Sequence, residues 1–154
     1  MMSIYPLIAA LLSNVIAQII KPFTKYRKTK EFDLYEVLSS GGFPSSHTST
    51  MSGMALAFGL RDGFDSSSFT ISFILMLIIA YDAMNVRLYA GKHIALTNQL
   101  IDDLKEIKTL RFDDPIYFTK MKKILGHERF EVLGGFFLGL IVSFILFFIV
   151  GGSL

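Results

Sequence analysis

The chain has 154 residues, of which 52% are hydrophobic and 18% are charged, and its mean hydropathy is +0.51. A soluble domain carries about a quarter of its residues as charged side chains, so this composition indicates an integral membrane protein. Disordered, collagen-like and disulfide-stapled classes are excluded, and the absence of cysteine excludes thiolate metal sites and cysteine nucleophiles. The net charge of +2 is too small to indicate a nucleic-acid-binding protein.

The first apolar segment covers residues 4–20 and is near the lower length limit for a membrane-spanning helix. Pro22 predicts that this helix stops there. The basic residues follow the segment instead of preceding it, so we expect a retained membrane anchor and not a secretory signal peptide. A basic stretch over residues 21–36 comes next, and the glycines and proline within residues 39–49 then break any helix.

Three further segments have helical patterns. Residues 47–60 predict a short helix of small and apolar side chains, which is too short to span fully but suited to close packing inside a bundle. Residues 69–83 are strongly apolar, and the helical pattern can continue to Ala90, giving a span whose last turns carry charge. The apolar spacing in residues 94–110 is typical of an amphipathic surface helix.

The clearest spanning helix covers residues 131–150, which carry no charge after Glu131. Gly135 and Gly139 form a GxxxG pattern in it, which allows a close helix contact either within the bundle or across a homodimer. The predicted fold is therefore an all-α polytopic membrane bundle, with about four membrane helices plus a cytoplasmic amphipathic helix, as a single domain over residues 1–154.

The distribution of positive charge predicts the orientation of this bundle. If the chain crosses the membrane at each predicted helix, residues 21–46 and 86–126 share one side, and of the 15 Lys and Arg residues only Arg61 lies on the other. The positive-inside rule then places the basic side in the cytoplasm of a multi-pass protein of the cell membrane. Topology signals and contacts with lipid headgroups account for most of these charges.

Unusual polar residues from four helices fall at this one membrane face. Ionisable groups at a membrane edge are costly to place, so several of them together predict a functional site. The candidate residues are Lys21, Arg27, Ser46, His47, Asp82, Arg87, His127 and Glu131.

The segment FPSSHT predicts a helix start with phosphate-binding capacity. Pro44 fits just ahead of a helix, and Ser45 or Ser46 can cap it, which leaves free backbone N–H groups near Ser46 and His47. Such a helix end binds phosphate well. A plain helix cap beside a solvated histidine is the alternative.

His127 and Glu131 are four residues apart and project from one face of a helix. Glu131 can then accept a hydrogen bond from one imidazole nitrogen while the other nitrogen faces a substrate, which is the base-orienting half of a catalytic triad. An ordinary ion pair is the alternative.

Asp82 and Arg87 end an apolar helix, where neither can comfortably face lipid. They form either an internal ion pair or a clamp in which Arg87 holds an oxyanion. His93 lies outside the apolar spans, and we expect it to be solvated. No HxxxH or HExxH spacing supports a metal site built from the three histidines.

Four segments in order carry a resemblance to a known family: AQIIKPF at residues 17–23, GGFPSSHTS at 41–49, YDAMNVRLYAG at 81–91 and LGHERFEVLGGFFLG at 125–139. Together they resemble the divergent type-2 phosphatidic acid phosphatase family, which is related to vanadium-dependent haloperoxidases. The resemblance covers most of the chain. The wider superfamily uses Lys-x6-Arg-Pro, Pro-Ser-Gly-His and Ser-Arg-x5-His-x3-Asp elements.

The second and third elements depart from that pattern. Ser46 stands where the superfamily has Gly, and Glu131 replaces the final Asp. Met121 occupies the place of the third-element Arg, so Arg87 can supply that charge from another helix.

The first element leaves its second basic residue open. Lys21 fits the pattern, whereas Arg27 is one residue early, Lys28 is in register and Lys30 is within reach.

The resemblance implies a mechanism without a metal or other cofactor. His127, oriented by Glu131, would attack phosphorus to form a phosphohistidine, while His47 protonates the leaving alkoxide and later activates water. The phosphoryl oxygens would be neutralised by backbone N–H groups near Ser46 and by basic side chains, with Asp82 orienting one of them. Those basic side chains are Lys21, Arg87 and a second residue of the first element, which is Arg27 or else Lys28 or Lys30.

The predicted activity is therefore the hydrolysis of a phosphomonoester or diphosphate of a lipid by a single membrane-embedded phosphatase-like domain. Phosphatidylglycerophosphate, phosphatidic acid and a polyprenyl diphosphate are the candidate substrates. The alternative is a protein that binds or translocates lipid phosphates without turnover, which would tolerate loss of His127. A metal-dependent enzyme, which chelators would inhibit, is a third interpretation.

Overall fold

The computed structural model describes residues 2–39, 41–107 and 128–151. These residues form five α-helices and two short 3-10 helices, which confirms the predicted all-α class. The α-helices are α1 (Tyr5–Thr29), α2 (Ser46–Asp62), α3 (Ser67–Met84), α4 (Val86–Lys105) and α5 (Arg129–Ile149), and the 3-10 helices are η1 (Met2–Ile4) and η2 (Leu34–Leu38).

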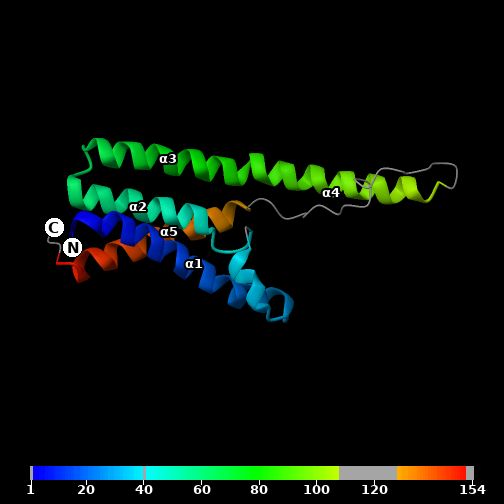
Figure 1. The fold of residues 1–154 in the computed structure, drawn as a ribbon, viewed down its shortest axis with the longest axis horizontal. Helices are drawn as coiled ribbons and strands as arrows, with labels where there is room; N and C mark the ends of the chain where they lie inside the picture. Colours follow the sequence, from blue (N-terminus) through cyan, green and yellow to red (C-terminus); the bar gives the residue numbers. More distant parts are fainter. Residues whose placement is uncertain (1, 40, 108–127, 152–154) are drawn as a thin grey trace.

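Helix α2 is the centre of the bundle, with α1 and α5 on one side and α3 on the other (Figure 1). The start of α1, the turn from α2 to α3 and the end of α5 lie at one end of the bundle. The connection from α1 to α2, the junction of α3 and α4 and the start of α5 lie at the opposite end, which we call the site end (Figure 1). The helix ends are therefore grouped at the two ends of the bundle in the way that the sequence predicts.

Within the described residues, three segments are long and apolar enough to cross a membrane: Met2–Thr29, Ser67–Lys105 and Arg129–Ile149. Large apolar side chains on their outer surfaces, such as Leu11, Ile78 and Phe137, are exposed, as expected where lipid tails surround the helices. The predicted count of about four membrane helices is met by these three segments plus α2, whose 17 residues pack among them.

Small residues bring α2 and α5 into close contact. Gly139 lies against the Ser49 carbonyl and the Ser52 hydroxyl, and a Cβ atom there would overlap both. The Ser52 hydroxyl also donates a hydrogen bond of 3.0 Å to the Phe136 carbonyl on α5. Because lipid supplies no hydrophobic force between helices, close packing and such hydrogen bonds hold them together.

Gly135 is buried in the same contact, against the Ser45 carbonyl. The GxxxG pattern is therefore used within the bundle, which was one of its two interpretations. A homodimer through Gly135 and Gly139 would need a face that α2 already covers.

The prediction that Pro22 ends the first helix is wrong, because α1 continues for two more turns to Thr29. Pro22 lacks the N–H that would bond the preceding turn, a loss that costs about 3 kcal/mol in a helix interior. Tertiary contacts hold the helix: Pro22 is fully buried, and the Thr24 hydroxyl donates a hydrogen bond of 2.7 Å to the Phe43 carbonyl outside the helix. The helix ends at Lys30, which adopts a left-handed conformation with φ of 63°.

The sequence predicts that the third span continues to Ala90 and that a separate surface helix begins at residue 94. The structure places the boundary between the two helices earlier. Helix α3 ends at Met84, and α4 begins at Val86 and continues nearly in line beyond the bundle (Figure 1). Asn85 bridges them, because its N–H bonds the Tyr81 carbonyl and its carbonyl accepts from Tyr89. A helix of 39 residues is about 58 Å long, roughly twice the hydrocarbon core, so α4 extends past the crossing made by α3. The predicted surface helix over residues 94–110 is described only to residue 107.

We predict that Gly139→Ala destabilises the bundle by about 1–3 kcal/mol, because its methyl group meets backbone and a hydroxyl that cannot move away. Gly134→Ala is the matched control on the same helix, since its methyl group meets the ring of Phe43, which can turn aside. Thermal unfolding in mixed micelles, followed by circular dichroism, compares the two variants. Equal stability of both would contradict the packing argument.

Candidate anion-binding site

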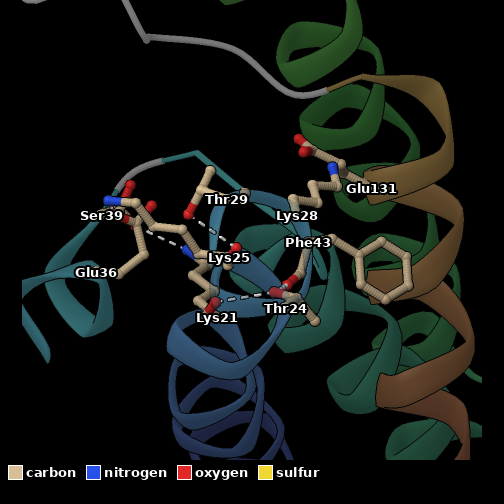
Figure 2. Close-up of a pocket in the computed structure, with 10 residues that line it drawn as sticks. Lys21, Thr24, Lys25, Lys28, Thr29, Glu36, Ser39, Phe43 and Glu131 are labelled. Carbon is tan, nitrogen blue, oxygen red and sulfur yellow. Dashed lines mark hydrogen bonds and ion pairs between the residues drawn. The ribbon is translucent and has the colours of Figure 1, made fainter. Parts of the chain in front are cut away.

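A cavity of about 310 Å³ opens at the site end, between the last turns of α1, residues 36–39 and 42–43 of the connection to α2, and the start of α5. Figure 2 shows Glu36 and Ser39 on one side of it, and Phe43 and Glu131 on the other. The lining residues are Lys21, Thr24, Lys25, Lys28, Thr29, Glu36, Ser39, Gly42, Phe43 and Glu131.

Three lysines of α1 share this cavity (Figure 2). Lys21, Lys25 and Lys28 are separated by four and three residues, which is the spacing of one helix face. Sequence reasoning omitted Lys25 and left Lys28 as one of three alternatives. The helical spacing from Lys21 was the signal that could have found both, but a helix expected to stop at Pro22 gave no reason to apply it.

Lys21 is the most buried charge of the site, with 1% of its surface exposed. Its ammonium group donates a hydrogen bond of 2.7 Å to the Ser39 carbonyl and a longer one of 3.5 Å to the Ser46 hydroxyl. A buried ammonium needs such partners, and the carboxylates of Glu36 and Glu131 supply nearby opposite charge. Lys21 therefore ties α1 to α2 and to the loop between them.

Lys25 holds the η2 segment against α1. Its ammonium group lies 2.8 Å from a Glu36 carboxylate oxygen and 3.3 Å from one of Asp33. Asp33 also caps η2, because its other oxygen accepts a hydrogen bond of 2.9 Å from the Tyr35 backbone N–H. Two carboxylates thus offset part of the positive charge on this wall of the cavity.

Lys28 lies at the opposite wall, beside two stacked aromatic rings. Its ammonium nitrogen is 4.9 Å from the centre of the Phe130 ring, a cation–π distance. Phe130 in turn stacks on Phe43 with ring centres 5.9 Å apart. By contrast, Arg27 is exposed and lies outside the residues that line the cavity.

The start of α2 is built as predicted, and Ser45 is its cap. The Ser45 hydroxyl accepts a hydrogen bond of 3.4 Å from the Thr48 N–H, and the Ser45 N–H donates one of 2.9 Å to the Glu131 carbonyl. The first turns of α2 and α5 are therefore adjacent. Ser46 is buried beside Lys21, whereas the side chain of His47 is exposed and outside the cavity lining.

Glu131 is buried in the first turn of α5 and lines the cavity. One of its carboxylate oxygens accepts a hydrogen bond of 3.2 Å from the Glu128 N–H, and Glu128 caps the helix in return, which makes a capping box. The two residues lie three apart in the sequence, a capping signal that the sequence reasoning did not use. His127, the predicted partner of Glu131, lies outside the described residues.

Arg87 and Asp82 pair with each other at the junction of α3 and α4. The Arg87 Nε is 2.6 Å from an Asp82 carboxylate oxygen, and neither residue lines the cavity. The ion-pair interpretation describes this geometry, and the structure does not bring Arg87 to the lysines. His93 is exposed on α4, as expected.

The site is rich in donors suited to an oxyanion. Three ammonium groups line the cavity, and the first turn of α2 adjoins it. The hydroxyls of Thr24 and Thr29 also line it, but both donate to backbone carbonyls. Across residues 2–39, 41–107 and 128–151, no group of three or more His, Asp or Glu side chains is placed to hold a metal ion.

Comparison with known proteins places the chain in a family. The model of the Divergent PAP2 family matches residues 2–142, a range that contains every residue of the cavity. The "Uncharacterized membrane protein YuiD" of Bacillus subtilis (strain 168) is 31% identical over 147 residues, covering 92% of this chain and 93% of that protein. No solved structure matches the chain. The chain is a membrane protein that belongs to the Divergent PAP2 family.

Proposed function

We propose that this protein hydrolyses a phosphomonoester or diphosphate of a lipid at the cavity of the site end. The observation that carries the proposal is the meeting of Lys21, Lys25 and Lys28 with the first turns of α2 and α5, at one end of a bundle of membrane-length helices. Membership of the Divergent PAP2 family supports a phosphatase-type reaction.

Binding of the phosphate is assigned to the lysine cluster. Lys21 and Lys28 both reach the cavity from one face of α1, so together they can neutralise the oxygens of a phosphoryl group. Lys25 can join them when the anion competes with Glu36 and Asp33 for its ammonium group. In this proposal, Lys25 and Lys28 take the role that the sequence motif left open among Arg27, Lys28 and Lys30.

The chemical step follows the family mechanism. His127 directly precedes Glu128, the cap of α5, and is four residues before Glu131 in the cavity wall. We assign His127 as the nucleophile that attacks phosphorus and forms a phosphohistidine while the bond to the leaving alkoxide breaks. His47 donates the proton to that alkoxide and then takes one from the water that hydrolyses the intermediate.

The position of the cavity favours a lipid substrate. It lies at the end of helices whose outer surfaces are apolar, so the substrate can keep its chain among lipid tails while its phosphate meets the lysines. Phosphatidylglycerophosphate, phosphatidic acid and a polyprenyl diphosphate all have this form. The charge distribution supports a cytoplasmic orientation of the site end in the cell membrane.

One observation favours a second candidate function, the binding or translocation of lipid phosphates without turnover. His47 does not line the cavity, although the lysines that would hold the anion do. A protein that only binds would need the lysine cluster and would tolerate the loss of His127.

We predict that His127→Ala lowers phosphate release by roughly a thousandfold or more, since it removes the nucleophile. Release from a panel of lipid phosphates by detergent-purified protein, with EDTA present, measures the effect. His93→Ala is the matched control on exposed α4 and keeps full activity. Full activity of His127→Ala would overturn the mechanism. Binding by both proteins without release by either would favour the second function, and activity lost only on adding EDTA would favour a metal-dependent enzyme.

We predict that Lys28→Met raises KM for the lipid phosphate about tenfold or more, because it removes a charge-assisted contact from the cavity wall. Arg27→Met and Lys30→Met test the other motif positions and change KM less, because neither side chain lines the cavity. Lys92→Met on α4 controls for the loss of one positive charge. A larger effect at Arg27 than at Lys28 would show that the structure assigns the second basic residue wrongly.

A further inference from the structure

The segment from Phe32 to Leu38, which we call the strap, has two different sides. On one side, Asp33 and Glu36 pair with Lys25 of α1, and Glu36 reaches the cavity. On the other side, the exposed fractions of Tyr35 and Leu38 are 85% and 84%. Large apolar side chains this exposed, in a segment otherwise rich in charge, indicate a surface that meets an apolar partner.

An aromatic cluster fixes where the strap lies along α1. The ring of Phe32 packs edge-on against Phe23, with centres 5.8 Å apart, and against Tyr26 at 6.4 Å. Phe23 and Tyr26 are themselves exposed on the outer face of α1. The strap is therefore held by two sets of contacts, this cluster and the ion pairs of Lys25, and together they fix its position along α1.

The length of α1 places that cluster at a membrane surface. Tyr5 lies near the start of the helix, and the distance along its axis from Tyr5 to Phe23 is about 27 Å at 1.5 Å per residue. The hydrocarbon core of a bilayer is about 30 Å thick, so one end of α1 and the cluster lie near its two boundaries. Aromatic side chains gather at these boundaries.

Charge next to the strap matches the same surface. Arg27, Lys28 and Lys30 are exposed in the last turn of α1 and directly after it, beside the cluster. Basic side chains near a membrane surface are attracted to anionic lipid headgroups. The apolar strap and this basic turn together have the composition of an interfacial membrane anchor.

We propose that the strap inserts the side chains of Tyr35 and Leu38 into the headgroup boundary of the bilayer leaflet at the site end. The partner is the lipid surface itself. Because Glu36 and Ser39 of the same loop line the cavity, the inserted strap holds the cavity at headgroup level. The insertion does not depend on hydrolysis, so it stands or falls separately from the proposed function.

The chain contains no tryptophan, so a single introduced tryptophan reports its own surroundings. Tyr35→Trp and Leu38→Trp are placed separately in the full chain, in vesicles of phosphatidylcholine and phosphatidylglycerol that carry bromine at defined acyl positions. We expect a blue-shifted emission and quenching that is several times stronger with bromine near the headgroup than with bromine near the bilayer centre. Phe23→Trp, on the lipid-facing surface of α1, is the positive control.

Two results would overturn the proposal. Emission typical of water, with quenching by aqueous acrylamide and none by brominated lipid, would place the strap in solvent. Emission that shifts with the ratio of protein to lipid would show that a second copy of the chain covers the strap. The use of two positions guards against a fault in one variant, and circular dichroism checks that each variant keeps its helical content.

Discussion

The close approach of α2 and α5 is the constraint on which the rest of the structure depends. It exists because Gly139 and Gly135 on α5 leave room for the backbone and serine hydroxyls of α2. The same contact brings the two helix starts together, where the Ser45 N–H bonds the Glu131 carbonyl. Without glycine at these positions the helices would separate by the width of a side chain, and the first turns that adjoin the cavity would no longer meet.

Burial of Lys21 couples this packing to the chemistry of the site. Its ammonium group bonds the loop at Ser39 and lies beside Ser46 of α2, so one side chain links three parts of the chain. Burying an ammonium is unfavourable unless it is paired, and Glu36 and Glu131 supply the opposite charge. The cavity lining therefore carries three lysines against two glutamates, and an incoming anion would have to compete with those carboxylates.

Helix α1 has two faces with different contacts. The lysine face lines the cavity, while Phe23 and Tyr26 face outward and contact Phe32 of the strap. Because Lys25 and the rings of Phe23 and Tyr26 all hold the strap against α1, the position of the strap and that of the cavity wall are linked.

The sequence by itself determined the all-α class, the apolar spans, the shared side of their charged ends and the cap of α2, because these depend on composition and on spacing within one helix. It also pointed to Lys21 and Glu131. Only the tertiary structure decided that α1 passes Pro22, since buried contacts outweigh the lost hydrogen bond, and hence that Lys25 and Lys28 join Lys21 on one face. It likewise decided that the GxxxG glycines of α5 pack against α2, and that Arg87 pairs with Asp82 away from the cavity. Contacts between helices distant in sequence leave no periodic signal along the chain, which is why these assignments required three-dimensional positions.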